Sequence, residues 1–166
     1  MKIFITGKPG VGKTTLIKKI YSNFPEKFFG FYTEEIRENK ERIGFKIITT
    51  WGEELLLASK NIRTDYRVKN YFVIKENIDI VSEKILENIN INKVILIDEI
   101  GKMELYSEKF KELVNIIIND EKINVLATIN LYYLPMVKNN YIYLKREDFN
   151  KIYKKIESII KNGNKN

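Results

Sequence analysis

Apolar residues along the chain follow two different spacings, which predict two kinds of secondary structure. Short continuous apolar runs are typical of strands buried on both faces, and they occupy residues 2–6, 94–97, 124–129 and 141–144. Apolar positions three or four residues apart predict helices over residues 13–21, 78–89, 107–118 and 149–161. Ser107 is expected to be the N-cap of the third helix. Because strands alternate with helices, we expect an α/β fold, with a mostly parallel sheet and helices on both of its faces.

The segment between the first and second predicted helices has a different pattern. Aromatic and β-branched residues predict strands at 29–33, 44–50 and 54–58, and polar turn segments separate them at 38–42 and 51–53. This arrangement indicates an antiparallel β-hairpin region inserted into the α/β fold. The polar segment 61–70 is expected to be a loop, and 71–74 a short strand.

A glycine-rich loop joins the first strand to the first helix and reads Gly7-Lys8-Pro9-Gly10-Val11-Gly12-Lys13-Thr14. This is the P-loop pattern, in which backbone N–H groups and a helix N-terminus surround a phosphate chain. Lys13 should bridge the β- and γ-phosphates, and the Thr14 hydroxyl should coordinate Mg²⁺. Thr15 is expected to help cap the helix and to contact the α-phosphate. A chance match is disfavoured because the strand, the loop and the helix occur in the required order.

Two carboxylates, Asp98 and Glu99, end the apolar run at 94–97. A strand that ends in Asp suits the Walker B role, in which the carboxylate holds Mg²⁺. We expect the two side chains to point to opposite faces of the strand, so that Glu99 can accept a proton from the attacking water. The chain has no histidine, which makes Glu99 the best available base. The alternative is that Glu99 only forms a salt bridge with a neighbour.

Polar residues also end the next predicted strand. Thr128 and Asn130 are candidates for contact with the γ-phosphate or the water, and local turn capping is the equally weighted alternative. An arginine could stabilise charge on the transferred phosphoryl group. No spacing singles out one of the five arginines, which are Arg37, Arg42, Arg63, Arg67 and Arg146. Without an assured arginine, turnover by the protein alone is expected to be slow.

Longer strings around these motifs resemble the small P-loop nucleoside-triphosphatases often labelled cancer-related or thermophile NTPases. The resemblance rests on residues 7–15, 30–37 and 42–47, and most strongly on Ile97-Asp98-Glu99-Ile100-Gly101-Lys102-Met103-Glu104-Leu105. It implies a RecA-like fold and hydrolysis of the β–γ bond of several nucleoside triphosphates. It also implies a second nucleotide-binding segment, made of Ile95, Leu96, Ile97, Asp98, Glu99, Ile100, Gly101 and Lys102.

Two positions depart from the family pattern. The family usually has a histidine after its Ala-Thr-x sequence, whereas Asn130 follows Ala127-Thr128-Ile129 here. An amide at this position can still orient water. The family also tends to carry Asn-Arg-Asp before the last helix, and Lys145-Arg146-Glu147-Asp148 keeps only the arginine in place. The resemblance therefore implies that Arg146 lies near the nucleobase.

Composition narrows the classes of function that remain. The 166 residues suit one domain, expected over 1–161, with a flexible tail at 162–166. Cysteine and histidine are both absent, which excludes thiol chemistry and imidazole ligands. The net charge of +7 comes from lysines scattered along the chain, so nucleic-acid binding is possible but not favoured. The apolar run at the N-terminus is too short for a signal peptide, and we expect a soluble, cytoplasmic monomer without a membrane partner.

The favoured interpretation is a Mg²⁺-dependent nucleoside-triphosphatase. A small-molecule or nucleoside kinase is the first alternative, because kinases of this size use the same loop. Arg63 and Arg67 in the polar segment would be the candidates for a kinase lid. The second alternative is a nucleotide-gated module that binds RNA.

Overall fold

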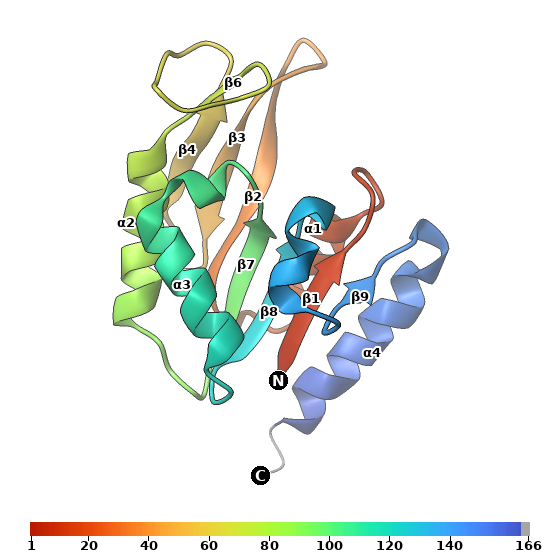
Figure 1. Ribbon diagram of the computed structural model, residues 1–166. Coiled ribbons are helices and arrows are strands. Elements are labelled where there is room, and N and C mark those ends of the chain that lie inside the picture. The colour runs from red at the N-terminus through yellow and green to blue at the C-terminus, as the bar shows by residue number, and fades with distance from the viewer. Residues whose placement is uncertain (164–166) are drawn as a thin grey trace.

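The computed structural model describes residues 1–163, and its central feature is one nine-stranded sheet (Figure 1). The strand order across the sheet is β5-β6-β4-β3-β2-β7-β8-β1-β9. The strands are β1 (Lys2–Thr6), β2 (Phe28–Glu38), β3 (Glu41–Thr49), β4 (Glu54–Ser59), β5 (Arg67–Val68), β6 (Tyr71–Val73), β7 (Val94–Ile100), β8 (Asn124–Ile129) and β9 (Ile142–Tyr143). The helices are α1 (Lys13–Asn23), α2 (Lys75–Glu87), α3 (Glu108–Asn119) and α4 (Phe149–Asn162).

Strand β2 joins a parallel part and an antiparallel part of this sheet. Its first half pairs in parallel with β7, and most of its length pairs antiparallel with β3. Beyond β7, the strands β8, β1 and β9 continue the parallel part, whereas β4, β6 and β5 continue the antiparallel part. The predicted β-hairpin region is therefore an extension of the same sheet.

A close backbone approach between β2 and β7 explains one glycine. A Cβ atom built at Gly30 would lie 1.9 Å from the carbonyl oxygen of Leu96. No side chain fits at that distance, so only glycine lets β2 pair with β7 at this point.

Helices cover both faces of the sheet, as the alternation of elements predicts. On one face α2 and α3 pack over the strands, and on the other face α1 and α4 do so (Figure 1). The buried strand residues alternate between the two resulting cores: Phe4 belongs to the first core, and Ile3 and Ile5 belong to the second. This alternation is what a strand buried on both faces requires.

The start of α3 matches its prediction, whereas the start of α1 does not. The hydroxyl of Ser107 accepts a hydrogen bond of 3.1 Å from the N–H of Phe110, which confirms Ser107 as the N-cap of α3. By contrast, the N-cap of α1 is Gly12 and no side chain forms a capping hydrogen bond there, so the prediction that Thr15 helps to cap this helix is wrong. The loop glycine leaves the first N–H groups of α1 for other acceptors.

The other differences concern where elements begin and end. Helix α2 begins before the predicted start at residue 78, and β2 runs well past residue 33. The polar segment 61–70 contains the two-residue strand β5, because Arg67 and Val68 pair with Phe72 and Tyr71. At the C-terminus, α4 includes Asn162, the first residue of the predicted flexible tail, and 164–166 lie outside the described residues.

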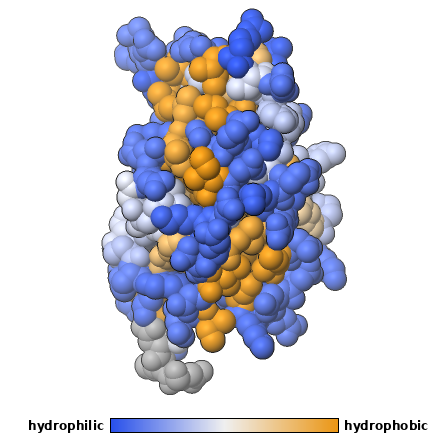
Figure 2. Space-filling model, turned by 90° about the vertical axis from the view of Figure 1, so that its left-hand side faces the viewer, coloured by the Kyte–Doolittle hydropathy of each residue, from blue (hydrophilic) through white to orange (hydrophobic). Residues whose placement is uncertain are grey.

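No helix within residues 1–163 combines the length and the apolar character needed to cross a membrane. The face that carries α2 shows apolar areas separated by hydrophilic side chains (Figure 2). Ile80, for example, is 51% exposed although it lies in α2.

Candidate functional site

The loop between β1 and α1 is held in shape by Lys13. Its ammonium group donates to the carbonyl oxygens of Gly7, at 2.8 Å, and of Lys8, at 3.1 Å. Burial lowers the pKa of Lys13, and the nearby carboxylates of Glu99 and Asp98 act in the opposite direction. Gly12 has a φ of 106°, a conformation that a glycine adopts without strain. The glycine spacing of the loop is thus a backbone requirement of this turn.

Asp98 lies at the centre of a buried hydrogen-bond network between three strands and α1. Its carboxylate accepts from the hydroxyl of Thr128 at 2.6 Å and from that of Thr14 at 2.9 Å. The backbone N–H of Thr33 donates to it at 3.5 Å. Burial raises the pKa of Asp98, and the hydrogen bonds from Thr128, Thr14 and Thr33 oppose that effect. The network ties the P-loop helix to the carboxyl ends of β7 and β8.

Glu99 follows Asp98 within β7, which extends to Ile100 and so includes both carboxylates. Burial and the adjacent charge of Asp98 raise the pKa of Glu99 to about 7, and the positive charge of Lys13 opposes them. A carboxyl with a pKa near neutrality can exchange a proton with water under ordinary conditions. Among the described residues no salt bridge involves Glu99. The alternative that Glu99 only forms a salt bridge with a neighbour therefore has no support there.

A cavity of about 660 Å³ lies over the P-loop and brings these groups together. Lys13, Thr14, Asp98 and Glu99 all line it. Strand β2 forms the opposite wall, through residues that include Thr33, Glu34, Glu35 and Arg37. The cavity thus combines cationic groups, hydroxyls and carboxylates at the carboxyl ends of the parallel strands, where α/β sheets bind ligands.

Comparison with known proteins shows which family the chain belongs to. A protein-family model described as NTPase matches residues 2–159, which is nearly the whole chain. The chain belongs to this NTPase family. A nucleoside-triphosphatase THEP1 of Thermotoga maritima is 50% identical over 139 residues, an alignment that covers 83% of this chain and 79% of the relative.

Solved structures of family members share the fold of this NTPase. The crystal structure of THEP1 from Aquifex aeolicus matches with a TM-score of 0.83 and 39% identity, over 96% of this chain and 98% of the other. The solution structure of a human cancer-related nucleoside triphosphatase matches with a TM-score of 0.79 and 30% identity, over 96% of both chains. The predicted P-loop NTPase fold is therefore confirmed.

The residues of segment 95–102, predicted to bind nucleotide, lie in different surroundings in this NTPase. Four of them are buried in the cores and line neither this cavity nor its neighbour: Ile95, Leu96, Ile97 and Ile100. They position Asp98 and Glu99 by packing. Gly101 is buried, and a Cβ atom built there would lie 2.9 Å from a carboxylate oxygen of Glu99. Lys102 is exposed, and it lines a second cavity beyond Glu99 rather than the cavity over the P-loop.

The residues at the end of β8 have separate roles in the NTPase structure. Thr128 is fully buried, and its hydroxyl donates the hydrogen bond to Asp98 described above. The side chain of Asn130 accepts from the N–H of Tyr132 at 2.9 Å, which is the local turn-capping alternative, and Asn130 also lines the second cavity. The sequence left the role of Asn130 open, because a turn-capping hydrogen bond to a neighbouring residue does not exclude a place in a cavity wall.

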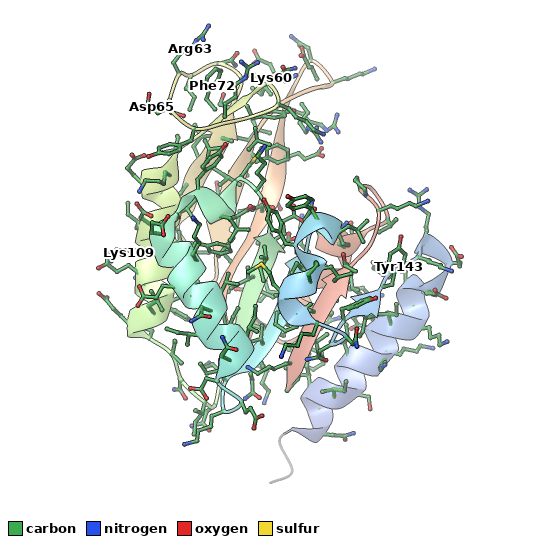
Figure 3. The ribbon with its side chains drawn as sticks, in the orientation of Figure 1. Lys60, Arg63, Asp65, Phe72, Lys109 and Tyr143 are labelled. Carbon is green, nitrogen blue, oxygen red and sulfur yellow. The ribbon has the colours of Figure 1, made fainter. Side chains whose placement is uncertain are left out.

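The five arginines of this NTPase lie in four places, and one of them, Arg42, lines the second cavity. Arg146 donates to the carbonyl oxygen of Gly10 at 2.9 Å and so contacts the P-loop from the start of α4. Arg63 and Arg67 both lie over the ring of Phe72 and line neither cavity. Figure 3 shows Arg63 and Phe72 at the far end of the antiparallel region. Sequence reasoning did not single out Arg37, although it lines the cavity over the P-loop and forms a salt bridge of 2.7 Å with Glu35. The signal was available in the alternation of Thr33, Glu35 and Arg37, which puts them on one face of a strand.

The residues that end β7 and begin α1 fit a magnesium ion. Mg²⁺ takes oxygen ligands, and in nucleotide sites it binds one or two protein groups together with phosphate oxygens. The Thr14 hydroxyl and the Asp98 carboxylate supply such oxygens, and their hydrogen bond of 2.9 Å places them side by side at the cavity. The chemistry and the position of this pair therefore suit the ion that a P-loop uses.

Proposed function

We propose that this NTPase family member is a Mg²⁺-dependent phosphohydrolase that cleaves the β–γ bond of ATP, GTP and other nucleoside triphosphates. The products would be a nucleoside diphosphate and inorganic phosphate. Family membership supports the hydrolase class. The dependence on Mg²⁺, the bond that breaks and the range of substrates are our inference from the site.

One observation supports the proposal more than any other. The carboxylate of Asp98 is fixed by hydroxyls from both the P-loop helix and β8, while the adjacent Glu99 has no such donors and a pKa of about 7. Two neighbouring carboxylates thus have different properties at one cavity. This is the pattern expected where one carboxylate holds a metal ion and the other handles a proton.

The P-loop would bind the phosphates through its backbone N–H groups and through the N-terminus of α1. Thr14 and Asp98 would hold Mg²⁺, which neutralises negative charge on the β- and γ-phosphates when it is bound. The ammonium of Lys13 has three N–H groups, two of which donate to loop carbonyls, so one remains for a phosphate oxygen. Lys13 would therefore fix the loop and the phosphate chain at once.

In the chemical step, the oxygen of a water molecule forms a bond to the γ-phosphorus while the bond from phosphorus to the bridging oxygen breaks. Glu99 would orient this water and accept its proton, and the diphosphate would leave with the bridging oxygen. Removal of a general base typically slows a reaction by about 10²–10⁴-fold. Phosphoryl transfer otherwise depends on positioning and on the stabilisation of charge.

A phosphate-release assay with ATP, GTP, CTP and UTP tests this proposal. We expect release in Mg²⁺ and its loss in excess EDTA. Glu99→Gln should lower kcat by about 10²–10⁴-fold and still bind ATP, because it removes the base but keeps the shape. Lys13→Ala should lose ATP binding as well.

The matched control is Glu38→Gln, which alters an exposed glutamate at the end of β2 outside the cavity. It should behave as the wild type. Equal rates in Glu99→Gln and Glu38→Gln would contradict the role of Glu99, and undiminished release by Lys13→Ala would contradict the assignment of the P-loop.

A further inference from the structure

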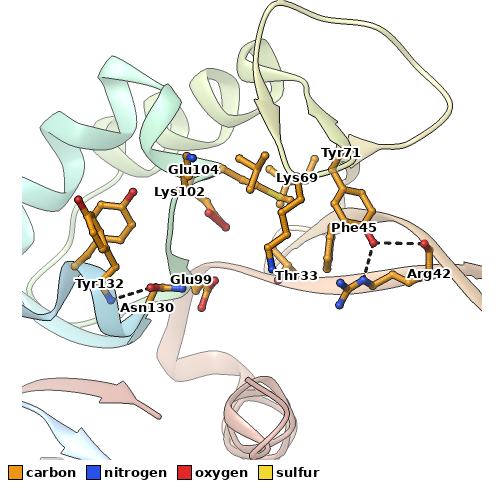
Figure 4. A pocket seen from close by; sticks show the side chains of 14 residues that line it. Thr33, Arg42, Phe45, Lys69, Tyr71, Glu99, Lys102, Glu104, Asn130 and Tyr132 are labelled. Carbon is orange, nitrogen blue, oxygen red and sulfur yellow. Dashed lines mark hydrogen bonds between the residues drawn. The ribbon is translucent and has the colours of Figure 1, made fainter. Parts of the chain in front are cut away.

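A second cavity, of about 590 Å³, lies directly beside the cavity over the P-loop. Its walls come from the antiparallel part of the sheet, from the segment after β7 and from the segment after β8 (Figure 4). The two cavities share three lining residues, Thr33, Phe45 and Glu99. Glu99 therefore borders the phosphate site on one side and this second cavity on the other.

The size of the second cavity exceeds what hydrolysis needs. One water molecule occupies about 30 Å³ of liquid, whereas pockets for small organic molecules measure about 300–1,000 Å³. A cavity of about 590 Å³ next to the proposed base is therefore large enough for an organic molecule in place of water.

The walls of the second cavity combine aromatic rings with cationic groups. Tyr132 and Tyr133 supply rings, and Tyr132 is 81% exposed, whereas Tyr71 is buried against Phe45 and Arg42. Lys69 and Lys102 line the same cavity, and the ammonium group of neither has a hydrogen-bond or ion-pair partner within residues 1–163. Aromatic faces bind planar rings, and unpaired ammonium groups bind anions.

Lys69 is directed into the cavity by its backbone. It lies in the turn between β5 and β6 and has a φ of 53°. The guanidinium of Arg67 donates to the Lys69 carbonyl at 2.6 Å and helps to hold the turn. In Figure 4 the side chain of Lys69 reaches down from this turn toward Thr33. The ammonium group is thus presented to a molecule that occupies the cavity beside Glu99.

We propose that the second cavity binds a phosphoryl acceptor, an alcohol that carries an aromatic ring and an anionic group, and that the protein transfers the γ-phosphate to it. The ring lies against Tyr132 and Tyr133, the anion binds Lys69 and Lys102, and the hydroxyl faces Glu99. The hydroxyl oxygen forms a bond to the γ-phosphorus, the bond to the bridging oxygen breaks, and Glu99 takes the hydroxyl proton. This inference rests on the proposed function, because it uses the same phosphate site and the same base.

Nucleoside 3′-monophosphates are suitable probes, because each has a free 5′-hydroxyl, an aromatic base and a separate phosphate. The protein is incubated with Mg²⁺, ATP and each of the four 3′-monophosphates, and mass spectrometry detects the 3′,5′-bisphosphate. The four uncharged nucleosides serve as comparison, and phosphate release is measured in the same samples. We expect a bisphosphate with at least one probe and at least tenfold less transfer to the matching nucleoside, which lacks the anion.

Two lysine variants test the cavity itself. Lys69→Gln removes the charge inside the cavity and should raise the KM for the acceptor by about tenfold or more, without a change in phosphate release when no acceptor is present. Lys40→Gln is the matched control. Lys40 also has a positive φ, of 68°, and its carbonyl also accepts from an arginine, Arg37, but it lines neither cavity.

The outcomes separate the two proposals. Phosphate release without a bisphosphate from any of the four probes would overturn the acceptor site and leave the hydrolase intact. An absence of both products would instead refute the proposed function. Equal effects of Lys69→Gln and Lys40→Gln on the acceptor KM would also overturn the assignment of the cavity.

Discussion

The hydrogen bond between Thr128 and Asp98 should contribute more to the free energy of unfolding than most single contacts in the protein. The two oxygens are 2.6 Å apart, Thr128 is fully buried, and Asp98 is 2% exposed. Thr128→Val keeps the shape of the side chain and removes the donor. A hydrogen bond to a charged group contributes about 1.5–3 kcal/mol, and at this chain length each kcal/mol shifts Tm by about 2–4 °C. We therefore expect Tm to fall by about 3–12 °C in Thr128→Val.

The neighbouring strand offers a matched control. Thr6 in β1 is also fully buried, but its hydroxyl has no hydrogen-bond partner in the part of the chain that the structure describes. A buried hydroxyl without a partner costs about 1–3 kcal/mol, so Thr6→Val should keep or raise Tm. The same chemical change should thus lower Tm at Thr128 but not at Thr6. This difference would show that the loss of the hydrogen bond, and not the loss of a hydroxyl as such, destabilises the protein.

Two measurements check this prediction. Thermal unfolding at pH 7.5 without Mg²⁺ gives the two Tm values, and a Mg²⁺ titration of phosphate release gives the functional effect. Thr128→Val should need more Mg²⁺ for half-maximal release, because the Asp98 carboxylate loses a group that orients it. The reasoning is refuted if Thr128→Val melts with the wild type, or if Thr6→Val is destabilised to the same extent.

Two further predictions concern the elements around the site. Ser107→Ala removes the N-cap of α3 and a hydrogen bond to Asp79, and it should lower the free energy of unfolding by about 1–2 kcal/mol in urea denaturation; an unchanged urea midpoint would argue against the cap. Glu104 is fully buried, and burial together with the charge of Glu99 raises its pKa well above its usual value. The folded protein therefore keeps a proton that the unfolded chain releases above about pH 4.5, so this residue makes stability fall as pH rises. Glu104→Gln does not titrate and should be more stable than the wild type at pH 8 but not at pH 4.5; the same difference at both values would contradict this account.

The sequence predicted those parts of the site that depend on local backbone requirements. Gly12 and the helix after it form a turn that a short string of residues specifies, and the run before Asp98 has the continuous apolar character of a strand buried on both faces. Arg37 was missed because it lies on the half-exposed end of β2, where the apolar pattern fades and the strand seemed to stop. The second cavity was missed for another reason: Lys69, Lys102 and Tyr132 come from three segments that only the order of the strands brings together.

The different surroundings of Asp98 and Glu99 support the different roles that we propose for these adjacent carboxylates. Both lose solvation in the fold, and this loss raises both pKa values. Two hydroxyls and one backbone N–H replace part of the solvation that Asp98 loses, and they hold its oxygens in fixed directions, as the proposed role of metal ligand would require. The pKa of Glu99 is raised further by the charge of Asp98 itself, and only the charge of Lys13 opposes this. The network that fixes Asp98 thus also keeps a negative charge beside Glu99, so a change in either carboxylate should alter the other.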